Sequence, residues 1–349
     1  MNGKPILIVP YMWIGDFVRC HTVVKLLQER HPGSAIDVLT TPAVAPLLDY
    51  MPGVRKGIIA DLPRKRLAWG QHAELAERLR AEGYGHALVM PRTWKSALAP
   101  YLARIPLRTG FLGEARFGLI NDLRLGERRL PRMVDRCAAL ALAKDEAVPS
   151  SWPLPELMVP ANDVERWRER RGLAIASRPA VAIAPGAVGP SKRWPVEYFV
   201  DLAARLVAAG HGVWILGGPQ EKNIAADILR AERTHIRDLT GPDLRDAILA
   251  LAAACAAVSN DSGLLHVAAA LGRPAIGIFG PTSPWHWAPL NPISAVIETA
   301  NVLACRPCHK PVCRLGHHRC MRDIKPEQIA LAARHALAKS PAPRRSDRF

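Results

Sequence analysis

The sequence contains no continuous apolar run of about 18 residues, the length that a membrane-spanning helix requires. Its first residues, Met-Asn-Gly-Lys, lead straight into an apolar segment without the pattern of a cleavable signal peptide. Aromatic residues are scarce at 6%, and no basic helix or RNA-binding signature is present, so nucleic acid is not an expected partner. These absences predict a cytoplasmic protein, for which any membrane contact would be peripheral.

Several cofactor motifs are also missing. Neither half of the chain has Gly-x-Gly-x-x-Gly after its first predicted strand, and no Gly-Lys-Ser/Thr loop occurs, which argues against a dinucleotide dehydrogenase and a nucleoside triphosphatase. The chain lacks an Asp-x-Asp signature, which agrees with chemistry that needs no metal. Seven cysteines in a cytoplasmic chain of 349 residues do not predict a disulfide framework.

What is present is a large, basic, α/β chain. The apolar content of 49% is enough for two cores, and the formal charge of +16 favours anionic partners, including a phosphorylated substrate or an anionic membrane face. Strand-like apolar runs alternate with helical patterns in both halves, which predicts parallel sheets with helices on both faces. The proline-rich residues 145–162 are the predicted linker.

The predicted domains therefore follow that linker. An N-terminal Rossmann-like domain covers residues 1–162, a C-terminal Rossmann-like domain covers 163–325, a helix at 326–338 packs back on the N-terminal domain, and 339–349 form a flexible tail. Open sheets of this kind bind ligands at the carboxyl ends of their strands. The two doubly wound domains are expected to face each other across a cleft.

Two loops in the second half have the composition of a phosphate site. Residues 185–195, which we call the donor loop, combine flexible backbone with Lys192 and Arg193 between a predicted strand and a helix opened by Pro195. Residues 259–266 read Ser-Asn-Asp-Ser-Gly-Leu-Leu-His before a helical stretch, where backbone N–H groups can bind an anion. Together they predict a site for a nucleotide diphosphate.

These segments, in this order, resemble the bacterial ADP-heptose:lipopolysaccharide heptosyltransferases of glycosyltransferase family 9. The resemblance also covers Trp-Ile-Gly-Asp at 13–16, Trp-Lys-Ser-Ala-Leu at 94–98 and Arg-Thr-Gly-Phe at 108–111, and it spans nearly the whole chain. Residues 116–122 and the cysteines of residues 305–320 look like those of the subgroup that adds the second heptose of the inner core.

The resemblance implies a GT-B fold and an inverting transfer that requires no cofactor. The implied donor is ADP-heptose, and the implied acceptor is heptosyl-Kdo2-lipid A at the cytoplasmic face of the inner membrane. Asp16 matches the family's catalytic aspartate, which would take the proton of the acceptor hydroxyl. Its alternative role is the N-cap of a helix starting at Phe17. Lys192 matches the lysine that contacts the donor phosphates and stabilises the leaving group.

The other expected donor contacts follow the same two loops. Arg193 adds a second cation, Glu221 at the end of a predicted strand is expected to bind the ribose hydroxyls, and Asp261 either contacts the donor or caps the next helix. The backbone N–H groups at the helix start and a histidine matched by the family complete the set: Ser262, Gly263, Leu264 and His266. His266 equally fits a buried, hydrogen-bonded core residue.

Three cations of the first half are candidates for the acceptor. Lys95, Arg116 and Arg136 are expected to meet phosphate or the carboxylate of the acceptor, because a guanidinium binds a carboxylate through two hydrogen bonds. Each one also fits an ordinary surface charge. Arg108 and its neighbours enter only through the family resemblance.

The cysteine segment, residues 305–320, has the ligand types of a structural zinc site. Cys305, Cys308, Cys313 and Cys320 are interspersed with three histidines, although their spacing is not that of a standard zinc finger. A reduced, packed loop is the alternative. At the level of function, three alternatives stay open: a heptosyltransferase acting at another step, a GT-B nucleotide-sugar epimerase, and a zinc-stabilised nucleic-acid-binding protein.

Overall fold

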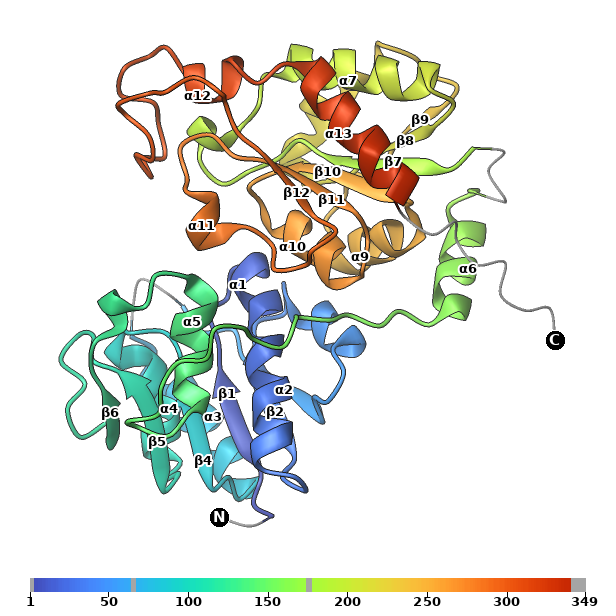
Figure 1. The fold of residues 1–349 in the computed structure, drawn as a ribbon. Helices are drawn as coiled ribbons and strands as arrows, with labels where there is room; N and C mark the ends of the chain where they lie inside the picture. Colours follow the sequence, from blue (N-terminus) through green and yellow to red (C-terminus); the bar gives the residue numbers. More distant parts are fainter. Residues whose placement is uncertain (1–2, 64–66, 174–177, 340–349) are drawn as a thin grey trace. The chain divides into compact units, whose positions relative to one another are not determined.

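The computed structural model describes residues 3–63, 67–173 and 178–339 and divides the chain into two compact units (Figure 1). The first unit is Met1–Pro155 and the second is Glu156–Phe349. The boundary falls inside the predicted linker, and the predicted domain limits stay predictions. The predicted tail at 340–349 lies outside the described residues.

The first unit is built on a six-stranded parallel sheet of order β3-β2-β1-β4-β5-β6. β1, β2 and β4 are buried along their whole length, because their apolar runs have a helical layer on each face. The chain adds strands on one side of the sheet from β1 to β3 and on the other side from β4 to β6, so the strand order reverses between β1 and β4. A crevice for a ligand is therefore expected outside the carboxyl ends of these two strands. The strands are β1 Ile6–Val9, β2 Ile36–Thr40, β3 Lys56–Ile59, β4 His86–Val89, β5 Leu107–Phe111 and β6 Asp122–Arg124.

Two helical stretches of the first unit are interrupted. The first begins at Ile14, three residues before the helix start predicted at Phe17, and is divided at Cys20 into α1 and α2. The helix that begins at Met133 ends at Ala138 and continues as a 3₁₀ turn. The helices are α1 Ile14–Arg19, α2 His21–Arg30, α3 Trp69–Ala81, α4 Trp94–Leu102 and α5 Met133–Ala138, with 3₁₀ turns at Ala45–Tyr50, Glu127–Arg129 and Ala139–Ala141.

The second unit repeats this topology with the strand order β12-β11-β10-β7-β8-β9. All its pairings are parallel, and the winding reverses between β7 and β10. The two sheets confirm the predicted α/β class with two doubly wound domains. The strands are β7 Ala180–Ala184, β8 Gly212–Ile215, β9 Ile236–Asp238, β10 Ala256–Asn260, β11 Ala275–Ile278 and β12 Ala295–Ile297.

The helices of the second unit cover both faces of its sheet (Figure 1). α6 begins at the end of the predicted linker and is anchored by Trp167, which is buried against Trp214 and donates a hydrogen bond to Asp246 at 3.0 Å. The helices are α6 Ala161–Arg170, α7 Val196–Ala208, α8 Lys222–Leu229, α9 Leu244–Ala253, α10 Gly263–Ala270, α11 Pro284–Trp287, α12 Arg319–Arg322 and α13 Pro326–Lys339, with 3₁₀ turns at Pro190–Lys192 and Pro219–Glu221.

The C-terminal helix α13 corrects one expectation. We expected it to pack back on the N-terminal domain, but it packs against α7 and against β10, β11 and β12 of the second sheet. Ile329 and Ala333, one turn apart, are fully buried in the core of this unit together with Met321 and Ile324. This apolar stripe is what places α13 on the second sheet. In the described part of the chain, no helix is long and apolar enough to cross a membrane.

Candidate functional site

The strongest candidate site lies where the winding of the second sheet reverses. The donor loop follows β7 and the segment after β10 begins with Asp261, so two neighbouring strands deliver their loops to one point. There the Lys192 ammonium lies 2.7 Å from a carboxylate oxygen of Asp261, which also accepts a hydrogen bond from Thr282 at 2.8 Å. Lys192 remains partly exposed, at 29%, whereas Asp261 is buried. A fixed, accessible cation is the arrangement that a diphosphate needs.

The start of α10 adds backbone donors to this point. Ser262 is the N-cap residue, and its hydroxyl lies 2.8 Å from that of Ser259. The expectation that Asp261 caps the helix is therefore wrong, because its carboxylate turns to Lys192 and Thr282. The first N–H groups of the helix belong to Gly263 and Leu264, and such groups favour an anion.

Asn260 holds the donor loop in place, a role that was not predicted from the sequence. Its side-chain oxygen accepts from the Trp194 N–H at 3.1 Å, and its amide donates to the Pro185 carbonyl at 2.7 Å. Asn260 is completely buried. Its two hydrogen bonds tie both ends of the loop that carries Lys192 to the end of β10. Its position in the segment 259–266 marked Asn260 as part of the site. Its partners Trp194 and Pro185 lie too far away in the sequence to be inferred from it.

We expect Asn260→Asp to weaken nucleotide binding as well as stability. The new carboxylate keeps an acceptor for Trp194 but faces the Pro185 carbonyl with an oxygen, at a cost of about 1–3 kcal/mol in the free energy of unfolding. Urea unfolding and calorimetric titration with ADP measure the two effects. Asn291 is the control, since it also uses both side-chain groups, to Ala269 and Ile293, outside the two loops. Equal loss of ADP affinity in Asn291→Asp would contradict the role of Asn260.

Glu221 lies beside the same edge of the sheet. Its carboxylate accepts from the Gly218 N–H at 2.8 Å, and a side chain added at Gly186 would come within 2.7 Å of it. A side chain added at Gly217 would come within 2.9 Å of Glu221, so these two glycines leave the space that Glu221 occupies next to the donor loop. The structure thus brings Glu221 to the donor loop, and its contact with a ribose stays a prediction.

The remaining donor residues are placed differently from one another. Arg193 is exposed, and its guanidinium donates to the Ala187 carbonyl within the donor loop at 3.1 Å. Trp194 is buried against Phe199 and belongs to the core. His266 lies on α10 and is buried, with 5% of its surface exposed. A buried position fits the structural alternative for His266 and leaves its contact with the donor a prediction.

Asp16 lies in the first unit, after β1, at the corresponding reversal of winding. It is the third residue of α1, and the N-cap is Trp13, so the alternative role of Asp16 as N-cap is wrong. Its carboxylate accepts from the Arg19 guanidinium at 2.6 Å, with 12% of the Asp16 side chain exposed. This pair fixes the orientation of the carboxylate at the carboxyl edge of the sheet, and the role of Asp16 as a general base stays a prediction.

The three acceptor cations do not share one environment. Lys95 is half-buried in the first turn of α4, and Arg136 is half-buried on α5, where it donates to the Leu130 carbonyl at 3.1 Å. Arg116 is completely buried and donates to the carbonyls of Pro91 and Phe111. Burial lowers the pKa of Arg116. Arg116 thus ties the ends of β4 and β5 together rather than presenting a cation to a solute.

The cysteines of residues 305–320 are all free thiols. Cys320 is buried, and burial raises the pKa of its thiol to about 11, with further increases from Cys308, Cys313 and Cys305 nearby. Across residues 3–63, 67–173 and 178–339, no group of three or more His, Cys, Asp or Glu side chains is arranged to hold a metal ion. The residue types fit zinc, and zinc binding by this segment stays a prediction.

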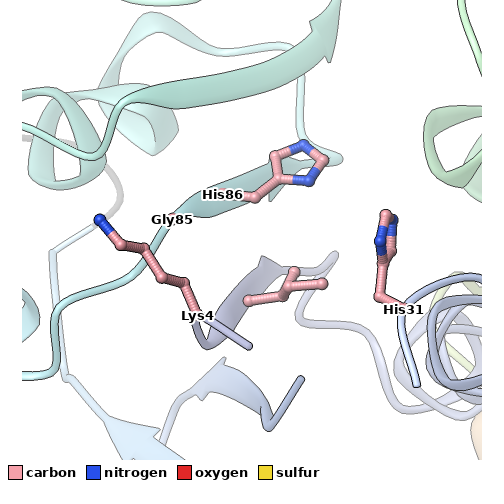
Figure 2. A pocket seen from close by; sticks show the side chains of 5 residues that line it. Lys4, His31, Gly85 and His86 are labelled. Atoms are coloured by element: carbon pink, nitrogen blue, oxygen red, sulfur yellow. The ribbon is translucent and has the colours of Figure 1, made fainter. Parts of the chain in front are cut away.

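A small pocket in the first unit lies away from these residues. Figure 2 shows Lys4, His31, Gly85 and His86, which line the pocket together with Ile6. Ile6 and His86 are the first residues of β1 and β4, so the pocket is at the amino end of the strands, opposite to Asp16. Burial lowers the pKa of His86 to about 4, which keeps the imidazole neutral near pH 7. We assign this pocket no part in the site.

Comparison with known proteins agrees with this geometry. Residues 72–318 match the model of glycosyltransferase family 9 (heptosyltransferase). The chain is 36% identical over 338 residues to lipopolysaccharide heptosyltransferase 2 of Escherichia coli K12, covering 93% of this chain and 96% of that protein. It is 35% identical over 349 residues to lipooligosaccharide heptosyltransferase 2 of Haemophilus influenzae Rd, covering 96% and 99%.

The fold of the chain is also similar to that of a solved heptosyltransferase structure. The E. coli ADP-heptose lps heptosyltransferase II superposes with a TM-score of 0.85 at 33% identity, covering 97% of this chain and 100% of that one. The match confirms the predicted GT-B fold of two α/β domains.

Proposed function

Because this chain belongs to glycosyltransferase family 9, the heptosyltransferases, we propose that it transfers heptose from ADP-heptose to the first heptose of the Kdo2-lipid A inner core. It is a lipopolysaccharide core heptosyltransferase of the second type, as its relatives of that type match it over nearly their whole length. The observation that carries the proposal for the donor is the Lys192–Asp261 pair beside the first N–H groups of α10.

The proposed mechanism is an inverting displacement. Asp16 accepts the proton of the attacking acceptor hydroxyl, and Arg19 holds its carboxylate in orientation. Lys192 and the amino end of α10 stabilise the negative charge that develops on the departing ADP. Glu221 binds the ribose of the nucleotide. These groups move one proton and stabilise one leaving group, and no step requires a cofactor.

The acceptor and the location of the enzyme are part of the same proposal. The enzyme works in the cytoplasm, in peripheral contact with the inner membrane, and takes heptosyl-Kdo2-lipid A as acceptor. Large apolar side chains are exposed after several strands of the first sheet, including Trp13 after β1, Trp69 after β3 and Leu125 after β6. Together with the net charge of +16, they support contact with a phosphorylated, acylated substrate.

Product analysis tests this proposal. We expect purified protein with ADP-heptose and a chelator to add one heptose to heptosyl-Kdo2-lipid A, as measured by mass spectrometry, and to leave bare Kdo2-lipid A unchanged. Transfer to bare Kdo2-lipid A would identify an enzyme of the first step instead. Loss of transfer with chelator, restored by a divalent metal, would contradict the metal-independent mechanism.

Structural zinc at the cysteine segment is a separate proposal. It rests on the composition of the segment, in which Cys305, Cys308, Cys313 and Cys320 are interspersed with three histidines, the ligand types of structural zinc sites. We expect about one zinc per chain in the purified protein by elemental analysis, and its loss in a Cys308→Ser, Cys313→Ser double variant. A fully active, stable protein without zinc would contradict the proposal.

A further inference from the structure

The cysteine segment, residues 305–320, is hydrogen-bonded to the donor loop at Ser191. Ser191 is buried and immediately precedes Lys192. Its N–H donates to the Pro311 carbonyl at 3.0 Å, its hydroxyl donates to the Lys310 carbonyl, and its carbonyl accepts from His318 Nε2 at 2.7 Å. The N–H, the hydroxyl and the carbonyl of Ser191 thus all form hydrogen bonds with the cysteine segment.

The same segment holds a second loop of the candidate site. The N–H groups of Cys308 and His309 both donate to the Pro281 carbonyl at 3.0 Å, and Arg306 Nε donates to the Gly280 carbonyl at 2.6 Å. These carbonyls immediately precede Thr282, whose hydroxyl donates to Asp261. The cysteine segment therefore supports Lys192 through its neighbour Ser191, and Asp261 through the loop that carries Thr282.

Two contact points of the segment have an uncommon backbone conformation. His309 has φ 53° and His318 has φ 49°, in the left-handed region that residues other than glycine rarely adopt. Such a conformation persists only where surrounding contacts impose it. At His318 it coincides with the start of α12 and with the hydrogen bond to Ser191.

From these contacts we propose that the cysteine segment is a clamp that holds Lys192 and Asp261 in place for the donor diphosphate, with His318 as its positioning residue. His318 acts through Ser191 and does not touch the donor. The proposal deepens the proposed function, since it concerns binding of the same donor. It also gives the segment a role that does not depend on whether its thiols bind a metal.

Replacement of His318 tests the clamp. In His318→Ala we expect amide hydrogen exchange in the donor loop to accelerate, and the Kd for ADP to rise, by about 3- to 10-fold each, the effect of losing one ordinary hydrogen bond. The KM for the acceptor should stay unchanged, because the first unit is untouched. His318→Gln, whose amide can donate to the Ser191 carbonyl, should recover part of the ADP affinity.

His317→Ala is the matched control. His317 is the neighbouring residue in the same segment, and its ring accepts from the Arg319 N–H rather than contacting the donor loop. Unchanged exchange and ADP affinity in His318→Ala would overturn the clamp, and so would an equal loss in His317→Ala. If even the unsubstituted protein bound no ADP, the proposed function would fail, while the exchange comparison would still decide the clamp.

Discussion

Asp16→Asn lowers kcat by about 100- to 10,000-fold while the Kd for ADP stays unchanged, the result expected for loss of a general base. The amide has nearly the shape of the carboxylate but cannot accept the proton of an acceptor hydroxyl. Asparagine is preferable to alanine here, because its side-chain oxygen can still accept from the buried Arg19 guanidinium. Steady-state kinetics with ADP-heptose, and calorimetry with ADP, measure the two quantities.

The control for Asp16 is an exposed acidic residue nearby in the sequence. Glu29 near the end of α2 is exposed, so Glu29→Gln should retain full activity. Comparison of the two variants shows whether the loss in Asp16→Asn comes from its position or merely from removing one negative charge. Near-normal turnover in Asp16→Asn would refute the assignment of the base. A large loss of ADP binding would instead show that Asp16 organises the protein rather than the chemistry.

Lys192→Ala should impair both binding and turnover. Its ammonium is the cation at the donor loop that pairs with Asp261, and a hydrogen bond to a charged group contributes about 1.5–3 kcal/mol, or roughly 10- to 150-fold in the Kd for ADP. A further decrease in kcat of about 100-fold follows if the charge stabilises the leaving group in the transition state. Calorimetry and the dependence of rate on ADP-heptose concentration separate the two effects.

Lys192→Arg and Arg230→Ala complete this experiment. Arginine keeps the charge but spreads it over a planar group, so it should restore part of the binding and less of the turnover. Arg230 is an exposed cation after α8 that pairs with Asp227, and its removal should leave ADP affinity unchanged. A kcat that falls in Lys192→Ala without any change in ADP affinity would show that the lysine acts only in the transition state.

The architecture and the two loops of the candidate phosphate site could be predicted from the sequence alone. Apolar runs such as β1 and β7 are buried strands because every residue in them is apolar, and their alternation with helices permits few topologies. The donor loop and the start of α10 were identifiable because their glycines, prolines and polar residues have strong local preferences. Local preferences act over a few residues, so this information is present in the sequence.

Which side chains meet could not be predicted and is seen in the folded protein. The pairing of Lys192 with Asp261, the two hydrogen bonds of Asn260 and the hold of His318 on Ser191 join segments that lie far apart in the chain. The packing of α13 on the second sheet and the complete burial of Arg116 were also not predicted. A local pattern shows that a residue can cap a helix or carry a surface charge. Which partner it finds depends on the loops that the two sheets bring together, because many weak contacts set their positions jointly.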